Sequence, residues 1–304
     1  MPKELKKLRE SPMNHIEDLV FWSACVRLKP FQEHVEAAAA GGFTSMSIAP
    51  DTYRDARKAG MSGSEIRNLA EEAGVPIRHF DTLSSWAPIR VPPNASREMR
   101  ERFDVSIDEA LDICAELGVS TILAVAGYPS GSIPHDVLVE GFADLCDRVA
   151  VANMWVDLEF MPILGLPTLE AAWSIVGEAA RPNSGVLVDT WHFVKGKSSL
   201  ETLKKIDSRY LRSMQLSDGF VAMRGKDLVD DMLSWREFPG DGELHVLQTL
   251  EAVKAAGSLT RIGCEVFSQS ANAMTAREAG IRSGKTTRRV MAQAGLDVYG
   301  TTNR

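Results

Sequence analysis

Short apolar segments rich in β-branched residues alternate with longer amphipathic segments along almost the whole chain. This alternation predicts strands near Phe21–Val26, Ser45–Ala49, Pro76–Leu83, Thr121–Gly127, Trp155–Met161, Gly185–His192, Leu211–Asp218 and Arg261–Ser268. Predicted helices cover Pro30–Ala40, Ser64–Ala73, Asn94–Leu117, His135–Ala152, Thr168–Ala179, Leu200–Ile206, His245–Ala256 and Ala273–Ala294. Strands and helices in this order indicate parallel strands joined by crossover helices.

Eight strand–helix units in a chain of 304 residues fit a closed barrel better than an open sheet. No Gly-x-Gly-x-x-Gly motif follows the first predicted strand, so we expect neither a dinucleotide-binding fold nor a nucleotide cofactor. No linker rich in proline, serine or glycine divides the chain. We therefore predict an α/β fold, a single-domain (β/α)8 TIM barrel over residues 1–304, with residues 1–18 as an N-terminal extension.

Composition narrows the classes of partner and the compartment. The 34 basic and 41 acidic residues give a net charge of −7, which offers nucleic acid no general attraction. No apolar stretch approaches the length of a membrane span, and the polar N-terminus lacks the apolar core of a signal peptide. The four cysteines are scattered, which indicates buried free thiols. The cytoplasm is therefore the expected location, with neither nucleic acid nor membrane as partner.

Polar residues interrupt the last four predicted strands at positions that should face the inside of the barrel. Alternate residues of a barrel strand point inward, and the apolar set on each of these strands is assigned to the helices. The inward polar residues are Asp157, Glu159, Asp189, Gln215, Ser217 and Glu265. Most lie near the carboxyl ends of their strands, where barrel enzymes build their active sites.

Three carboxylates converging in one cavity would repel one another, and burying them would be costly. A bound dication would remove this cost, so we predict a metal site formed by Glu159, Asp189, Gln215 and Glu265. All four offer oxygen atoms, which favours Mn²⁺ or Mg²⁺, with Co²⁺ or Zn²⁺ as alternatives. The competing interpretation is that internal arginine or lysine residues neutralise these carboxylates. No such residue is expected on the inward face of the last four strands.

Five segments carry a resemblance to a known family. They are Val156–Pro162 (VDLEFMP), Val186–Phe193 (VLVDTWHF), Met214–Gly219 (MQLSDG), Arg236–Leu244 (REFPGDGEL) and Gly263–Ser268 (GCEVFS). Together they resemble the xylose isomerase-like barrel superfamily, often labelled sugar phosphate isomerase/epimerase. The resemblance implies the same four metal ligands, although many members have histidine where this chain has Gln215. It also implies that His192 lies beside the substrate and that Arg236 reaches substrate oxygens.

The resemblance implies a divalent-metal-dependent sugar or keto-sugar isomerase or epimerase. In such enzymes the ion chelates a carbonyl and a neighbouring hydroxyl, and two carboxylates, here Glu159 and Glu265, remove and return a proton. The alternative is a lyase on a related keto substrate, similar to inosose or dehydroshikimate dehydratases or to 3-oxo-glycoside C-deglycosidases. Substrates would be small sugars, polyols or keto-glycosides. A homo-oligomer or a small partner subunit remains open.

Two further rivals are less well supported. The DNA repair endonucleases of the superfamily need a histidine-rich trinuclear zinc cluster and a basic surface, whereas this chain has six histidines and a net negative charge. A non-catalytic barrel would have no use for an intact set of inward carboxylates.

Four other side chains are candidate site residues on position alone. His79 shares the predicted inward face of the third strand with Ile77 and Asp81, so it is a candidate acid or base; a hydrogen-bonded barrel histidine is the equal alternative. Trp86 lies in a long loop after that strand and is a candidate for stacking on a substrate ring, as are Trp22 and Trp191.

Overall fold

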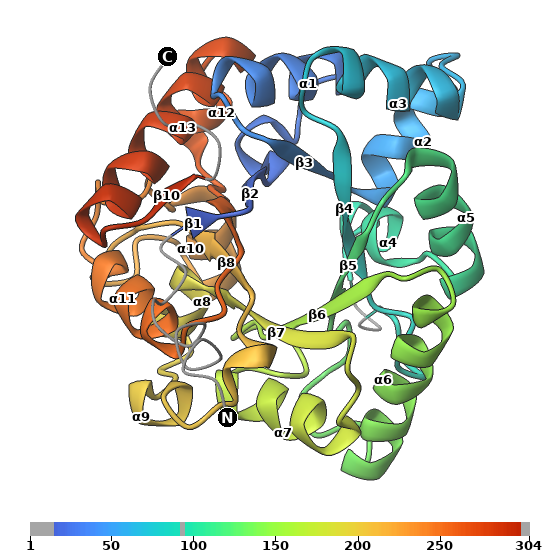
Figure 1. Cartoon of the computed structure of the whole chain (residues 1–304), viewed down its shortest axis with the longest axis vertical. Coiled ribbons are helices and arrows are strands. Elements are labelled where there is room, and N and C mark those ends of the chain that lie inside the picture. The colour runs from blue at the N-terminus through green and yellow to red at the C-terminus, as the bar shows by residue number, and fades with distance from the viewer. Residues whose placement is uncertain (1–14, 92–94, 299–304) are drawn as a thin grey trace, which may run out of the picture.

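The computed structural model describes residues 15–91 and 95–298 and shows a closed barrel of eight parallel strands (Figure 1). The strands are β2 (Asp18–Phe21), β3 (Ser45–Ile48), β4 (Ile77–Leu83), β5 (Thr121–Val125), β6 (Trp155–Glu159), β7 (Ser184–Asp189), β8 (Ser213–Leu216) and β9 (Arg261–Cys264). Each strand pairs with the next in the sequence, and β9 closes the barrel by pairing with β2, where Gly263 lies opposite Val20. The predicted fold class is confirmed.

Helices surround the barrel on the outside (Figure 1). The α-helices are α1 (Phe31–Ala40), α2 (Pro50–Lys58), α3 (Gly63–Glu72), α4 (Arg97–Phe103), α5 (Ile107–Leu117), α6 (His135–Ala150), α7 (Leu169–Ala179), α8 (Thr190–Lys195), α9 (Leu200–Leu203), α10 (Leu228–Ser234), α11 (Val246–Ala256), α12 (Gln269–Asn272) and α13 (Ala276–Gln293). Gly118 and Gly257 have φ of 76° and 91° and end α5 and α11, because glycine adopts this left-handed conformation without a side-chain clash.

Several predicted elements differ from those observed, and α2 and α10 were not predicted. The first strand runs from Asp18 to Phe21, and the residues after it, Ser23–Val26, form a 3₁₀ helix rather than strand. The sixth predicted strand stops at Asp189, because the Asp189 side chain accepts a hydrogen bond from the backbone N–H of His192 and caps α8. The long helix predicted to end at Leu117 is two helices, α4 and α5, the second capped by Ser106.

The base of the barrel contains a buried polar group. Asp157 points inward, as predicted, and its carboxylate accepts hydrogen bonds from Ser213 at 2.5 Å and from Arg261 at 3.1 Å. Arg261 is the first residue of β9 and shares its inward parity with Gly263. The expectation that the last four strands carry no inward arginine was therefore wrong. A Cβ atom on Gly263 would lie 1.8 Å from the Val20 carbonyl oxygen, so glycine permits the close approach of β2 and β9.

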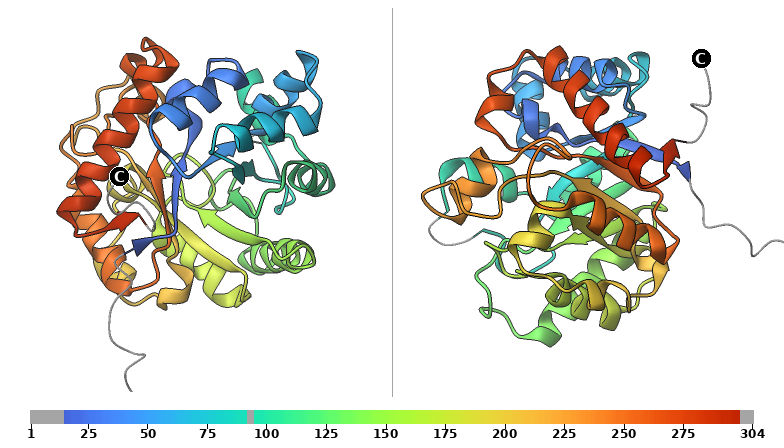
Figure 2. Two further views of the ribbon diagram at one scale, coloured as in Figure 1. Left: turned by 45° about the horizontal axis from the view of Figure 1, so that its top comes forward. Right: turned by 90° about the vertical axis from the view of Figure 1, so that its left-hand side faces the viewer.

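Two short strands pair at the amino-terminal end of the barrel. Residues 15 and 16 form β1 (His15–Ile16), which pairs with β10 (Asp297–Val298), at the opposite end of the molecule from α4 and α10 (Figure 2). Residues 15–18, which the sequence assigned to an N-terminal extension, thus belong to the fold; residues 1–14 lie outside the described part. Within the described residues, none of the helices is long and apolar enough to span a membrane.

Candidate metal centre and active site

A cavity of about 180 Å³ opens at the carboxyl ends of the barrel strands. Its lining includes four of the predicted site residues: Glu159, His192, Arg236 and Glu265. Apolar residues of α4 and α10 form part of its wall. The position agrees with the general location of active sites in this fold.

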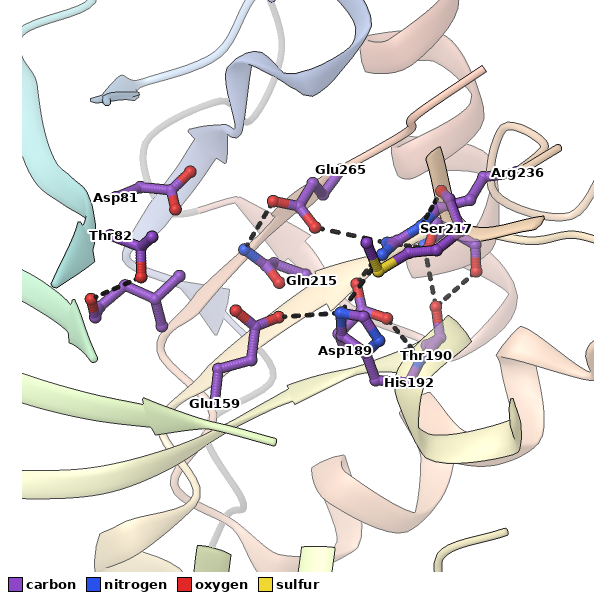
Figure 3. Close-up of polar contacts among 12 residues, drawn as sticks. Asp81, Thr82, Glu159, Asp189, Thr190, His192, Gln215, Ser217, Arg236 and Glu265 are labelled. Carbon is purple, nitrogen blue, oxygen red and sulfur yellow. Dashed lines mark hydrogen bonds and ion pairs between the residues drawn. The ribbon is translucent and has the colours of Figure 1, made fainter. Parts of the chain in front are cut away.

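Four neighbouring strands or their ends carry the predicted metal ligands, of which Glu159 and Glu265 line this cavity (Figure 3). Glu159 ends β6, Asp189 ends β7, Gln215 lies in β8 and Glu265 follows β9. All four side chains are buried. The Gln215 amide nitrogen donates a hydrogen bond to Glu265 Oε1 at 3.3 Å, which links the last two residues directly.

His192 lies closer to this cluster than expected. Potential ligand atoms of Glu159, Asp189 and His192 all lie within 4.8 Å of one another. His192 Nε2 is 3.5 Å from Glu159 Oε1, and the whole side chain is buried. Glu265 does not belong to this group, so the structure brings together a set of three that includes this imidazole, and the set of four oxygen ligands stays a prediction.

Arg236 is almost inaccessible to solvent, lines the cavity and contacts two carboxylates of the cluster. Its Nη1 atom lies 3.0 Å from Asp189 Oδ2 and 3.4 Å from Glu265 Oε2, and it donates to Ser217 Oγ at 3.2 Å. Its guanidinium also lies over the Trp191 ring at 5.0 Å. Arg236 was predicted to reach substrate oxygens, but its Nη1 atom contacts oxygens of the protein. It is an internal arginine of the kind that the competing interpretation required, although it comes from a loop and not from a strand.

One arginine does not neutralise the cluster. Burial, together with the charges of Glu265 and Asp189, raises the pKa of Glu159 well above its usual value. Burial also raises the pKa of Glu265 to about 8, although Arg236 opposes the rise. Burial lowers the pKa of His192 to about 3, so this imidazole is neutral at physiological pH. The two glutamates thus lack sufficient positive charge nearby.

Two buried oxygen atoms without a hydrogen-bond partner indicate whether these residues could hold a metal ion. Glu159 Oε1 and Gln215 Oε1 are buried and have no hydrogen-bond partner. Buried polar atoms are nearly always paired in folded proteins, so two unpaired oxygens beside two other carboxylates call for an electropositive ligand. Oxygen-rich donor sets suit Mn²⁺ and Mg²⁺, and an imidazole would also suit Zn²⁺. The residues present therefore fit a divalent ion.

His79 does not join this site. It pairs in register with Thr121 at the start of β5, whereas Glu159 pairs with Val125 at the end of that strand, so His79 lies deeper in the barrel. Its Nε2 atom is 3.1 Å from Asp18 Oδ2 and its ring packs on Trp22 at 5.1 Å. This geometry favours the alternative of a hydrogen-bonded barrel histidine.

We expect His79→Ala to lower stability without loss of metal. The substitution removes a buried ring and leaves Asp18 without its main partner, which should cost about 2–4 kcal/mol of unfolding free energy. Burial alone would raise the pKa of Asp18, but hydrogen bonding and charge interaction with His79 hold it at about 2. Stability from this pair is thus fully present above pH 4 and declines as the pH falls towards 2.

The measurement is urea unfolding of both proteins over this pH range, with the metal content determined by elemental analysis. The wild type should lose more stability than the variant on acidification. Metal loss in the variant would instead connect His79 to the metal centre.

The three candidate tryptophans are also excluded from the cavity lining. Trp86 is buried, donates its indole N–H to the Val125 carbonyl at 2.7 Å and packs on Tyr128 and Phe142. Trp22 lies inside the barrel against His79, and Trp191 lies beneath Arg236. The prediction that Trp86 stacks on a substrate ring was therefore wrong, because the ring folds inward and fills a core position.

The wall facing the metal centre contains residues that sequence patterns did not single out as site residues. Asp81 and Thr82 at the end of β4 line the cavity, and Arg102 of α4 bonds Asp81 Oδ2 at 3.2 Å. Burial raises the pKa of Asp81, while Arg102 opposes the rise. Asp81 could have been recognised as a candidate from sequence, because it shares the inward face of its strand with His79. Nothing in the periodicity of α4 pointed to Arg102.

A family model described as xylose isomerase-like TIM barrel matches residues 35–287. The 3-dehydroshikimate dehydratase of Pseudomonas putida is 23% identical over 255 residues, which cover 81% of this chain and 37% of that protein. The inosose isomerase of Bacillus subtilis is 28% identical over 183 residues, covering 58% of this chain and 64% of that protein. The chain thus spans less than two thirds of the length of either relative.

The chain is also similar in structure to the IolI protein, which was solved with a bound zinc atom. The two structures match with a TM-score of 0.76 at 21% sequence identity, and the match covers 91% of this chain and 99% of that chain. At this level of identity the likeness establishes a common fold.

Proposed function

We propose that this chain, which belongs to the xylose isomerase-like TIM barrel family, is a divalent-metal-dependent enzyme that removes a proton next to the carbonyl group of a hydroxylated substrate. The observation that carries the proposal is the buried group of Glu159, Asp189, Gln215 and Glu265, in which two oxygens, Glu159 Oε1 and Gln215 Oε1, have no hydrogen-bond partner. The similarity to an inosose isomerase and a dehydroshikimate dehydratase supports a small polyhydroxylated keto substrate.

Glu159, Asp189, Gln215 and Glu265 would hold the ion, with His192 as the alternative to Gln215 or Glu265. A bound Mn²⁺ or Mg²⁺ would polarise the substrate carbonyl and so make the neighbouring C–H group more acidic. The oxygen-rich donor set favours these ions, and Zn²⁺ becomes the better candidate if His192 is a ligand.

Glu159 and Glu265 both line the cavity, so both can exchange a proton with a substrate bound there. We assign one glutamate to removing the proton and the other to returning it. Asp81 and Arg102, across the cavity, would bind substrate hydroxyl groups and fix which carbon faces the glutamates.

Elimination is the second candidate reaction, because it begins with the same proton transfer. Asp81 favours it: a buried carboxyl group with a raised pKa, facing the cluster, could donate a proton to a departing hydroxyl group. The isomerase candidate needs no such donor.

The test is incubation of the Mn²⁺-loaded protein with keto-sugars, inososes and 3-oxo-glycosides in D₂O, followed by NMR. An isomerase or epimerase would incorporate deuterium at one carbon and keep every oxygen. A lyase would release water or an aglycone. Failure of the loaded protein to exchange a proton on any substrate of these three classes would count against the proposal.

We expect Gln215→Leu to weaken metal binding and Gln215→His to change its selectivity. The amide oxygen is a neutral, modest donor, so its loss should lower Mn²⁺ affinity about tenfold or more, while an imidazole should favour Co²⁺ and Zn²⁺. Titration calorimetry with Mn²⁺ and Zn²⁺ on both variants and the wild type provides the measurement. Unchanged Mn²⁺ affinity in Gln215→Leu would assign the site to the set that contains His192.

A further inference from the structure

Apart from its polar floor, the cavity has a large apolar wall. The apolar lining residues come from α4, from the loop after β6, from α10 and from the segment after β9; they are Met99, Phe103, Met161, Ile163, Leu164, Val229, Met232, Leu233 and Phe267. The substrate of the proposed reaction, a small polyhydroxylated carbonyl compound, has no apolar surface that would need such a wall.

The apolar wall is one continuous surface. Ile163 packs against the cluster that contains Phe103 and Leu164 and also against the cluster that contains Met232. It thus joins the residues of α4 to those of α10 across the mouth of the barrel.

The helices that carry this wall are fixed in place by polar contacts outside it. Lys195 of α8 forms a 2.8 Å ion pair with Asp231 of α10, and both side chains are almost fully buried. Asp231 also accepts hydrogen bonds from the backbone N–H groups of Arg224 and Gly225. Ser96 caps α4 by accepting a hydrogen bond from the backbone N–H of Met99. The apolar residues are therefore presented by anchored helices.

We propose that this wall is a binding subsite for an aromatic substituent of the substrate, next to the metal centre that holds the carbonyl end. The inference rests on the proposed function, which fixes only that end. Three methionines in the wall favour an aromatic ring, because thioether sulfur makes favourable contacts with ring edges. The substrate class is thus a hydroxylated carbonyl compound, such as an oxidised sugar ring, that bears an aryl group.

Two hydroxamic acids test the subsite. Acetohydroxamate and benzohydroxamate present the same metal-chelating group and differ in a methyl or a phenyl substituent. On the Mn²⁺-loaded protein, titration calorimetry should show benzohydroxamate binding about 30-fold more tightly, equivalent to about 2 kcal/mol. Met99→Ser and Leu233→Ser, on the two facing helices, should each reduce this ratio to a few-fold while leaving acetohydroxamate affinity unchanged.

Both side chains are only partly buried, so the variants should fold, which circular dichroism would verify. Val151→Ser is the matched control, because Val151 is 89% exposed and lies outside the cavity lining; its ratio should equal that of the wild type. Equal affinity of the wild type for the two hydroxamates would overturn the subsite.

Failure of both hydroxamates to bind would instead contradict the proposed metal chemistry. In that case ligand-observed NMR of the metal-free protein with benzyl alcohol decides on the subsite. Saturation transfer to the wild type that is lost in Leu233→Ser supports it, and no transfer to the wild type overturns it.

Discussion

Glu159→Gln is expected to abolish turnover and to lower metal affinity by more than about 100-fold. Losing a group that merely hydrogen bonds to a metal ligand already costs about 10- to 100-fold in affinity, so losing a charged ligand should cost more. The metal-free variant should nevertheless be at least as stable as the wild type. Burial raises the pKa of Glu159, so its ionised form disfavours the folded state at neutral pH, and the neutral amide removes this effect.

The measurements are elemental analysis, Mn²⁺ titration calorimetry and urea unfolding with and without a chelator. Asp157→Asn is the control, because Asp157 lies two residues earlier on the same strand and contacts Arg261 and Ser213 at the base of the barrel. It should lower stability and leave the metal content unchanged. If Glu159→Gln kept its metal and Asp157→Asn lost it, the assignment of the two carboxylates would be reversed.

Arg236→Met should destabilise the metal-free protein by about 3–5 kcal/mol, the usual cost of leaving buried charges without a partner. Arg236 contacts both Asp189 and Glu265, and all three side chains are buried. A divalent cation would restore positive charge beside these carboxylates. We therefore expect Mn²⁺ to add more unfolding free energy to this variant than to the wild type.

Arg261→Met provides the comparison for that experiment. It removes an arginine from an ion pair with Asp157, remote from the cavity lining. Both variants should unfold at lower urea concentration, but Mn²⁺ should add only the wild-type increment to Arg261→Met. Equal increments in all three proteins would show that Arg236 and the ion do not share the same carboxylates.

Strand parity was sufficient to predict that Glu159 and Asp189 point into the barrel. In a barrel strand the direction of a side chain alternates strictly, so the apolar residues that flank Glu159 and Asp189 determine that both point inward. The same rule gives no depth along the barrel axis. His79 and Asp81 therefore looked equivalent in sequence, although only Asp81 lies at the level of the cavity.

The contacts of loop residues could not be predicted from sequence periodicity. Arg236 was recognised from its motif, yet its contacts with two carboxylates depend on how the segment after α10 folds back over β7 and β9. Trp86 and Arg102 follow the same strand, and one enters the core while the other reaches the cavity. The direction of each side chain depends on long-range packing, such as the hydrogen bond from the Trp86 indole to the Val125 carbonyl. The local sequence pattern therefore does not predict it.

Strand ends form much of the polar part of the cavity, and two short helices form much of its apolar part. This separation affects how the substrate selectivity of such a protein can change. The carboxylates belong to the barrel strands or directly follow them, where a shift would disturb the whole sheet, whereas α4 and α10 are seven-residue insertions between a strand and its main crossover helix. Evolution or an engineer could exchange either insertion and alter substrate selectivity while the proton-transfer machinery stayed intact. Grafting α4 and α10 together onto a related barrel would then transplant the preference for an aryl group without transplanting the reaction.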